Sequence, residues 1–280
     1  MPLPQQRSRT VAAVVVSVAL ASAGIATAVW SARRPPEEVR TLEVVLRRLS
    51  QGNDLGKQPL HFMVGSGSYT AQLAAQRGLC KPEQCDMFAQ LNPYQRYGNG
   101  WDELMRQGYA LGDIQGWSAS SGTVVLPRAT FRAYGTHTGY LACTVAHEIA
   151  HIRRYHIFQQ SYHLSHNLRG QSEQARNLAE MKRSRELELE ADRDAATMLA
   201  RAGYPARICQ HELEFMARSV GDGSSTEPDS THPGYEDRLA AMRAHYDAME
   251  KKPPAPETST RISTSYSRSD NLLTITPRPR

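Results

Sequence analysis

The 280-residue sequence contains only four cysteines, and only one of its hydrophobic runs is long. One such run is too few for a polytopic membrane protein, and the ordinary glycine and proline content excludes a collagen-like chain. The sequence has neither the G-x-S-x-G pattern of serine hydrolases nor a phosphate-binding loop that ends in Gly-Lys-Ser or Gly-Lys-Thr. The length is typical of one domain with attachments, or of two small domains. It is enough to bury a core without help from disulfides or metal.

The net charge of +5 is distributed unevenly. Residues 1–34 carry +4 and residues 251–280 carry another +4, which leaves −3 for residues 35–250. Because the predicted folded domain, 35–250, is mildly acidic, it lacks the basic face that nucleic acids require, and we expect no nucleic-acid partner. Residues 251–280 are also rich in Pro, Ser and Thr, which predicts a disordered tail.

The long hydrophobic run covers residues 11–30, twenty residues without a charge. As a helix it is long enough to span a bilayer, so residues 1–34 can be a single transmembrane anchor. They can equally be a secretory signal peptide, with Ala26-Thr27-Ala28 as its cleavage site. In both cases we expect the folded domain to lie outside the cytoplasm, either membrane-anchored in the cell envelope or periplasmic after cleavage.

Hydrophobic periodicity predicts mostly helix. Apolar residues at helical spacing predict an amphipathic helix over 37–49, and from Thr138 onward the chain is expected to be mainly helical. The polar stretch 161–174 is typical of an irregular segment. The charged stretch 174–201, which is followed by a Gly and a Pro, predicts one long helix.

Strand signals are confined to the first half of the chain. A short strand is predicted at 61–64. Two more are predicted at 109–114 and 123–127, joined by a turn over the Ser/Gly-rich residues 117–122.

The cysteines suggest disulfides without requiring them. Cys80 and Cys85 are close enough in sequence for a local disulfide, and a zinc ribbon is disfavoured because no second Cys pair has the spacing it needs. Cys143 and Cys209 lie in separate helical stretches and can pair only if those helices pack together. Two buried free thiols are an equal alternative for them.

The strongest motif is His147-Glu148-Ile149-Ala150-His151. On a helix the two histidines lie one turn apart on the same face, so both imidazoles can bind one zinc ion. Glu148 points away from that ion's ligand positions and can act as a general base toward water. The apolar residues on the back of this predicted helix are the context that the motif needs, although two surface histidines on an ordinary helix would share the spacing.

A zinc hydrolase needs a third protein ligand. Cys143 lies too far along the helix from His151 to share an ion with it. Glu188 and Asp192 share one face of the predicted helix 174–201, which makes Glu188 a candidate ligand and Asp192 a candidate acceptor for a ligand imidazole. The alternative for this acidic run is a solvated helix face.

The HEIAH motif, the later SRELELEAD stretch and Thr231-His232-Pro233 with Arg238 resemble the HtpX-like and CAAX-prenyl-protease-type zinc endopeptidases, including the Oma-type enzymes. The resemblance runs from about Gly108 to Met249. It implies a zincin-like fold, mainly α with a small antiparallel β-sheet (α+β), and one Zn²⁺ per chain. It also implies a role for each matching residue: His147, His151 and Glu188 as zinc ligands, Glu148 as catalytic base, Asp192 as support for a ligand histidine, and His232 and Arg238 near the active-site cleft.

The chain departs from this family in two respects. Multi-spanning members have several membrane helices, whereas this sequence has one candidate segment, which puts intramembrane substrates in doubt. Family members often carry Asn-Ala before the sheet hairpin, whereas the corresponding stretch here is Gln115-Gly116-Trp117-Ser118.

His232 has three possible roles at this stage. It can donate a hydrogen bond to the oxyanion of the transition state, bind zinc as a fourth ligand that keeps the enzyme latent, or be a loop histidine without a role. The other nearby histidines, His156, His163 and His166, are expected to be surface residues rather than a second metal site.

The function predicted from these motifs is zinc-dependent endopeptidase activity on protein or peptide substrates, in quality control of envelope or membrane proteins. One alternative is a zinc-bearing, chaperone-like binding module that does not need proteolysis. Another is a zinc hydrolase of non-peptide amides, which would use the same water chemistry. Membrane contact is expected through the N-terminal segment, and the sequence predicts no particular oligomeric state.

Overall fold

The computed structural model describes residues 34–220 and 225–278. The predicted signal peptide or anchor therefore lies outside the described residues, except for Arg34. Within the described part, no helix has the length and apolar character needed to cross a membrane. The fold below concerns the unit that extends from Glu38 to the C-terminus.

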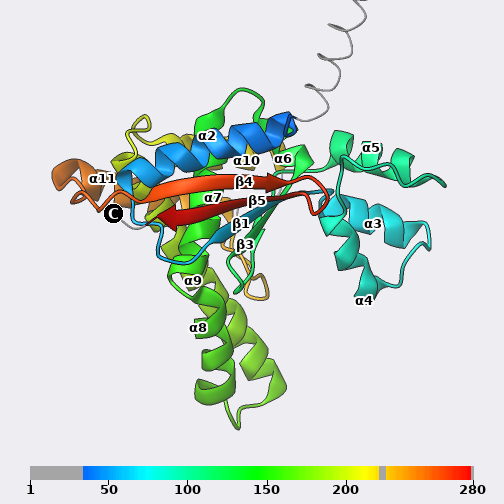
Figure 1. Cartoon of the computed structure of the whole chain (residues 1–280). Coiled ribbons are helices and arrows are strands. Elements are labelled where there is room, and N and C mark those ends of the chain that lie inside the picture. The colour runs from blue at the N-terminus through cyan, green and yellow to red at the C-terminus, as the bar shows by residue number, and fades with distance from the viewer. Residues whose placement is uncertain (1–33, 221–224, 279–280) are drawn as a thin grey trace, which may run out of the picture. The chain divides into compact units, whose positions relative to one another are not determined.

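Helices make up most of the structure (Figure 1). They are α2 (Glu37–Gly52), α3 (Ser68–Gln76), α4 (Pro82–Cys85), α5 (Trp101–Leu111), α6 (Arg128–Tyr134), α7 (Thr138–Arg153), α8 (His156–Tyr162), α9 (Glu173–Arg201), α10 (Ile208–Val220) and α11 (Tyr235–Lys251), with a 3-10 segment η1 (Asp86–Gln90) and a π-helical segment η2 (His163–Asn167). The strands are β1 (Leu60–Gly65), β2 (Trp117–Ser118), β3 (Thr123–Pro127), β4 (Arg261–Ser267) and β5 (Leu272–Arg278). The predicted mainly helical α+β class is confirmed.

The five strands form one mixed sheet in the order β2-β3-β1-β5-β4. The expectation of a purely antiparallel sheet is wrong, because β1 and β3 pair in parallel, with Phe62 opposite Val124. The chain between them passes through α3 and α5, which supplies the long connection that parallel neighbours need. The short strand β2 forms one edge of the sheet, and this edge lies beside α7.

The C-terminal region is ordered by the sheet. The prediction of a disordered tail over 251–280 is wrong from Arg261 onward, because β4 and β5 form a hairpin and β5 pairs with β1. Leu273 and Ile275 alternate with polar residues, and both are completely or almost completely buried. The Asn271 amide in the hairpin turn also donates a 2.6 Å hydrogen bond to the carbonyl oxygen of Val64. Burial and strand pairing together outweigh the polar composition.

The strand predicted at 109–114 is also wrong. Helix α5 continues through Leu111, and the edge strand β2 lies inside the segment predicted as a turn. The helical state of this region is fixed by packing: Gly108 lies against Thr70 of α3 so closely that a side chain there would overlap the threonine hydroxyl. The amphipathic helix predicted over 37–49 is confirmed as α2, whose apolar residues are buried in the core.

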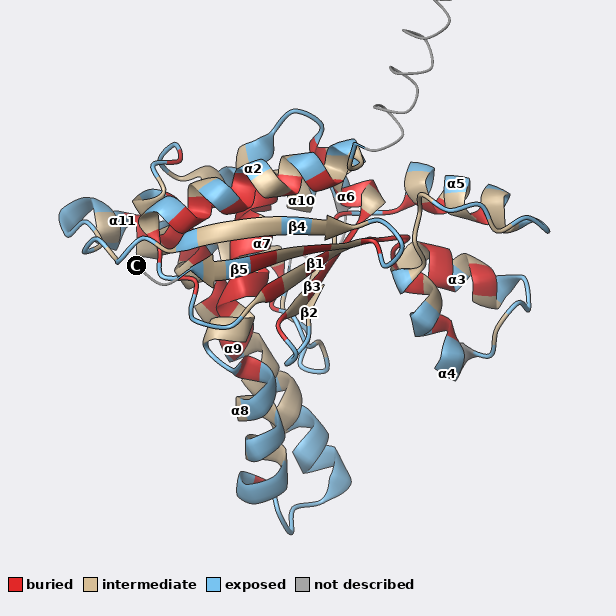
Figure 2. Cartoon of the chain, in the orientation of Figure 1, coloured by how far each residue is buried: buried red, intermediate tan, exposed pale blue. Residues whose placement is uncertain are grey.

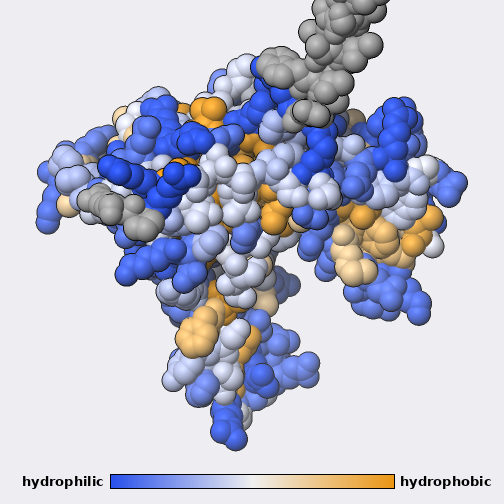
Figure 3. Space-filling model, viewed as in Figure 1, coloured by the Kyte–Doolittle hydropathy of each residue, from blue (hydrophilic) through white to orange (hydrophobic). Residues whose placement is uncertain are grey.

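Helices α8 and α9 form a hairpin whose outer half is largely exposed (Figure 2). The irregular segment predicted at 161–174 is largely helical, since it contains the end of α8 and the segment η2. Arg183 of α9 donates a 2.8 Å hydrogen bond to the side chain of Gln159, which ties the two helices together. Phe158 is 68% exposed, and hydrophobic atoms lie beside hydrophilic ones on this hairpin (Figure 3).

Candidate metal centre

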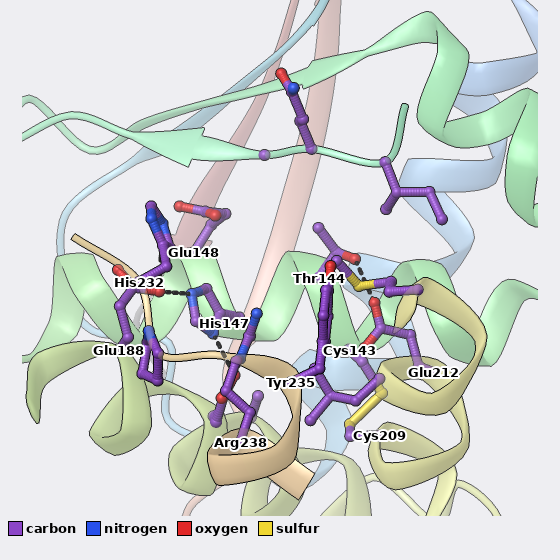
Figure 4. A pocket seen from close by; sticks show the side chains of 18 of the residues that line it. Cys143, Thr144, His147, Glu148, Glu188, Cys209, Glu212, His232, Tyr235 and Arg238 are labelled. Carbon is purple, nitrogen blue, oxygen red and sulfur yellow. Dashed lines mark hydrogen bonds and ion pairs between the residues drawn. A yellow bond between two sulfur atoms is a disulfide. The ribbon is translucent and has the colours of Figure 1, made fainter. Parts of the chain in front are cut away.

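The packing of α7 against α9 brings three side chains to one point. His147 and His151 lie one turn apart on α7, and Glu188 faces them from α9 (Figure 4). One ligand atom from each residue lies within 4.8 Å of the others. The three residues expected to bind zinc are thus adjacent, although Glu188 lies 37 positions after His151 in the sequence.

The spacing of these atoms is within a few tenths of an ångström of the spacing that zinc requires. The Nε2 atoms of His147 and His151 are 3.0 Å apart, and they lie 3.2 and 3.4 Å from the two Glu188 carboxylate oxygens. Ligand atoms around a tetrahedral zinc ion, with bonds of about 2.0–2.2 Å, lie about 3.3–3.6 Å from one another. Two imidazole nitrogens and a carboxylate are also the donor set of many catalytic zinc sites.

Asp192 and Arg238 hold His147 from behind. The Nδ1 atom of His147 lies 3.0 Å from Asp192 Oδ1, and the Arg238 guanidinium donates to both Asp192 oxygens at 2.8 and 2.7 Å. Burial alone would raise the pKa of Asp192, but Arg238 and His147 hold this pKa well below its usual value. Asp192 is therefore a charged acceptor that fixes the orientation of the His147 ring, with Nε2 toward the ligand site.

His151 is held by another histidine. The Nδ1 atom of His156 lies 3.0 Å from His151 Nδ1, so one of the two must donate to the other. Burial lowers the pKa of His156 and keeps its ring neutral, so its Nδ1 can accept the proton of His151 Nδ1–H. The expectation that His156 is a surface residue is wrong, because it is only 2% exposed. Its Nε2 atom lies 3.7 Å from Glu190, and this ion-pair distance is too long for a hydrogen bond.

Glu148 lies beside the ligand site but belongs to a different face of α7. It is 6% exposed, and the hydroxyl of Ser118 on β2 forms a hydrogen bond with its carboxylate. Burial raises the pKa of Glu148 above its ordinary value, and the His147 ring and Ser118 lower it only in part. Gly116 makes room for this carboxylate, since a side chain there would come within 3.2 Å of Glu148 Oε1.

His232 lies in the loop before α11, at the edge of the site. Its side chain is 64% exposed, and its Nε2 atom lies 3.8 Å from Glu188 Oε2. Arg185, one turn before Glu188 on α9, donates hydrogen bonds to the carbonyl oxygens of Glu227, Pro228 and Ser230 in the same loop. Arg185 therefore fixes the loop that carries His232, a role that the sequence analysis did not assign to it.

A cleft of about 700 Å³ is lined by His147, His151, Glu188 and Glu148, and also by Asp192, His232 and Arg238. The edge strand β2 and the residues just before it form one wall, α7 and α9 carry the candidate metal ligands, and α10, α11 and the His232 loop form the rest. The three candidate ligands, Glu148 and a free strand edge thus open into one cavity.

Residues 114–246 match the family model described as peptidase family M48. This region belongs to the M48 family of zinc metallopeptidases. The match contains the whole ligand set together with Glu148, His232 and Arg238, and M48 enzymes depend on zinc to hydrolyse peptide bonds. No curated protein and no solved structure matches the chain.

Both cysteine pairs are disulfides. Cys143 and Cys209 join α7 to α10 inside the M48 domain, and this packing is the condition on which their pairing depended. Cys80 and Cys85 close a local loop outside the matched region. The Cys143–Cys209 disulfide lines the cleft. It also fixes α10 relative to α7, the helix that carries the two candidate histidine ligands.

Proposed function

We propose that this metallopeptidase is an endopeptidase in which His147, His151 and Glu188 hold the zinc ion and Glu148 is the general base. The observation that carries this proposal is the position of Glu148, which is buried in the same cleft as the three ligand side chains. A zinc ion held there supplies Lewis-acid activation of water and of the scissile carbonyl group.

The chain's own groups then handle the protons. Burial raises the pKa of Glu148, which makes its carboxylate a stronger base than an exposed glutamate. It takes a proton from the attacking water and passes it to the leaving amine, so one side chain serves both steps. Asp192 keeps the His147 ring oriented throughout, because its own charge is paired with Arg238.

The edge of β2 supports an extended polypeptide as the substrate. This strand pairs with β3 on one side only, and Gln115 to Ser118 line the cleft. A peptide can add to the free edge through main-chain hydrogen bonds, which places its carbonyl groups next to Glu148. Binding through the main chain suits an enzyme that cleaves within unfolded proteins of varied sequence.

His232 keeps two candidate roles. Its Nε2 atom is close enough to Glu188 to reach either a developing oxyanion or the zinc ion itself. A His232→Ala variant separates them, because loss of an oxyanion donor lowers the rate, whereas loss of an inhibitory ligand raises it.

The proposed location is the cell envelope, with the M48 domain outside the cytoplasm and membrane contact through residues 1–34. The uncharged run 11–30 supports export, and so do the two disulfides, which persist in oxidising compartments. Quality control of envelope or membrane proteins is the corresponding role.

The test is cleavage of casein and of unstructured peptides by the purified protein. EDTA should abolish cleavage and zinc should restore it, and Glu148→Gln should lower kcat by at least about 100-fold while zinc content is unchanged. Glu186→Gln, an exposed acid on α9, is the matched control and should have wild-type activity. Cleavage at the wild-type rate by Glu148→Gln would refute the proposal. Function in cells that survives Glu148→Gln would favour the chaperone-like module.

A further inference from the structure

One acidic side chain in the cleft has no part in the metal centre. Glu212 of α10 is 5% exposed, yet it is among the residues that line the cavity. In the view of Figure 4 it lies on the other side of Tyr235 from His147 and Glu188. Thr144, its neighbour on α7, precedes His147 by three residues, a rise of about 4.5 Å along the helix. Glu212 therefore lines the same cleft as the candidate metal ligands, and it contacts α7 about one helical turn before His147.

Only one of the two carboxylate oxygens of Glu212 has a hydrogen-bond partner among the described residues. The hydroxyl of Tyr134 donates a hydrogen bond to Glu212 Oε1, and the Thr144 hydroxyl lies 3.4 Å from the same atom. In the described part of the chain, no hydrogen bond or ion pair reaches Oε2. Oε2 is nevertheless not one of the fully buried atoms without a partner, so it is accessible from the cleft, where a donor supplied by a ligand can reach it.

The charges around Glu212 also leave it unbalanced. Arg238 is the only Lys or Arg among the described residues that line the cleft, and both of its hydrogen bonds to a carboxylate go to Asp192. Asp113 lines the cleft as well, and its charge acts on Tyr235, as does that of Glu212. Burial raises the pKa of Glu212 to about 7, and the Tyr134 hydrogen bond and Arg238 offset this only in part. This end of the cleft therefore favours a cation.

Apolar groups also line the cleft. Ile114, Leu213 and Met216 line the cleft together with the Cys143–Cys209 disulfide. Such walls suit a long aliphatic stem, and the carboxylate suits a donor at the end of that stem. Lysine and arginine are the two side chains that combine these features.

We infer that this end of the cleft is a side-chain subsite for a lysine or arginine next to the scissile bond, with Glu212 as the specificity-determining acceptor. The inference rests on the proposed endopeptidase function and adds a substrate class to it. The basic residue's stem lies along the apolar walls, and its terminal N–H groups donate to Glu212 Oε2. A hydrogen bond to a charged partner inside a cleft is strong enough to set a preference of about tenfold or more in kcat/KM.

The experiment compares peptides that differ only at the two positions that flank the cleaved bond. Each position carries in turn lysine, norleucine, which has the same stem without the amine, and Nε-acetyl-lysine, which lacks the charge. The assay is run at pH 8, where the Glu212 carboxylate is mainly ionised. At one of the two positions, the wild type should cleave the lysine peptide at least about tenfold more efficiently than the norleucine peptide.

Glu212→Gln should bring that ratio to within about threefold of unity, and the ratio corrects for any change in the amount of active enzyme. Glu214→Gln is the matched control, because Glu214 lies on the same helix and instead accepts a hydrogen bond from Gln210. It should keep the wild-type ratio. If Glu212→Gln does not fold, the wild-type enzyme alone tests the inference. A kcat/KM at least about tenfold higher for the lysine peptide than for the Nε-acetyl-lysine peptide would then support the subsite.

Two results would overturn the inference: a wild-type enzyme without preference for lysine at either position, or a Glu212→Gln variant with an unchanged preference. A zinc-loaded wild type that cleaves none of the peptides would refute the proposed function and the subsite with it. Cleavage without preference would refute the subsite alone, so the two failures are distinguishable.

Discussion

His156 and His151 face each other through their Nδ1 atoms at 3.0 Å, although His156 lies beyond the helix that carries the motif. Tyr155, with a positive φ of 56°, ends the first helix and starts the next, and this change of direction brings His156 back toward the metal centre. The His156 ring accepts the Nδ1 proton of His151, which leaves Nε2 of His151 free to bind a metal ion. We therefore expect zinc binding to depend on a residue outside the HExxH motif.

His156→Phe should lower zinc affinity about 10- to 100-fold, the usual effect of removing a group that orients a metal ligand. His156→Asn should retain affinity within a few-fold, because the side-chain oxygen can take the place of Nδ1 as acceptor. Affinity is measured by competition with a chromogenic chelator at fixed pH. His163→Ala, on the exposed part of the same hairpin, is the control. Equal affinities of the Phe and Asn variants would mean that His156 only fills space.

Arg238 neutralises the buried charge of Asp192. Arg238→Met should lower the free energy of unfolding by about 3–5 kcal/mol, because Asp192 would be left buried without its cationic partner. Arg243→Met on the same helix removes an exposed arginine, 3.7 Å from Glu214, and should cost less than about 1 kcal/mol. Urea denaturation of both variants measures the difference. A loss of less than 1 kcal/mol for Arg238→Met would contradict the assigned role.

Arg185 holds the loop that carries His232, and we expect it to affect activity through that loop. Arg185→Ala should change kcat/KM by roughly 3- to 10-fold, in the same direction as His232→Ala, with zinc content unchanged. The double variant should resemble His232→Ala alone, because Arg185 acts only by positioning that histidine. Arg183→Ala, which removes contacts to Gln159 and Glu186 instead, is the control. Additive effects of the two substitutions would rule out this positioning role.

The sequence was sufficient for the features that depend on local helical spacing. His147 and His151 share a face because they are four residues apart, and the same periodicity put Glu188 and Asp192 on one face of α9. These relationships follow from helix geometry alone, whatever the rest of the fold does. The contact between α7 and α9, which brings Glu188 to the two histidines, did not follow from spacing. It was implied by the family resemblance, which assigns Glu188 as a zinc ligand.

Features that depend on distant pairing were missed. The strand β5 is stabilised by β1, about two hundred residues earlier, so the Pro/Ser/Thr-rich composition gave no sign of it. The alternation of Leu273 and Ile275 with polar residues was the available signal. The burial of His156 had no comparable local signal, because it depends on how α8 turns back against α9.

Glu212 makes stability depend on pH. Its pKa is raised by burial to about 7 in the folded protein, against about 4.3 for an unfolded chain. Between these values the folded state holds a proton that the unfolded state has released, so stability falls as the pH rises. The expected loss between pH 4 and pH 8 is about 2–4 kcal/mol from this group.

Glu212→Gln should remove this loss, because the amide resembles the protonated acid and does not ionise. The variant and the wild type should then unfold at similar temperatures at pH 4.5, and the variant should be the more stable of the two at pH 8. Other groups titrate in both proteins, among them Asp192 and His147, so the difference between the two melting curves isolates Glu212. A constant difference across the pH range would show that the pKa of Glu212 is the same in the folded and the unfolded protein, and it would contradict this prediction. A carboxylate that destabilises the fold at neutral pH gains most from a cationic ligand, so adding a lysine-containing peptide should raise the wild-type melting temperature more than that of Glu212→Gln.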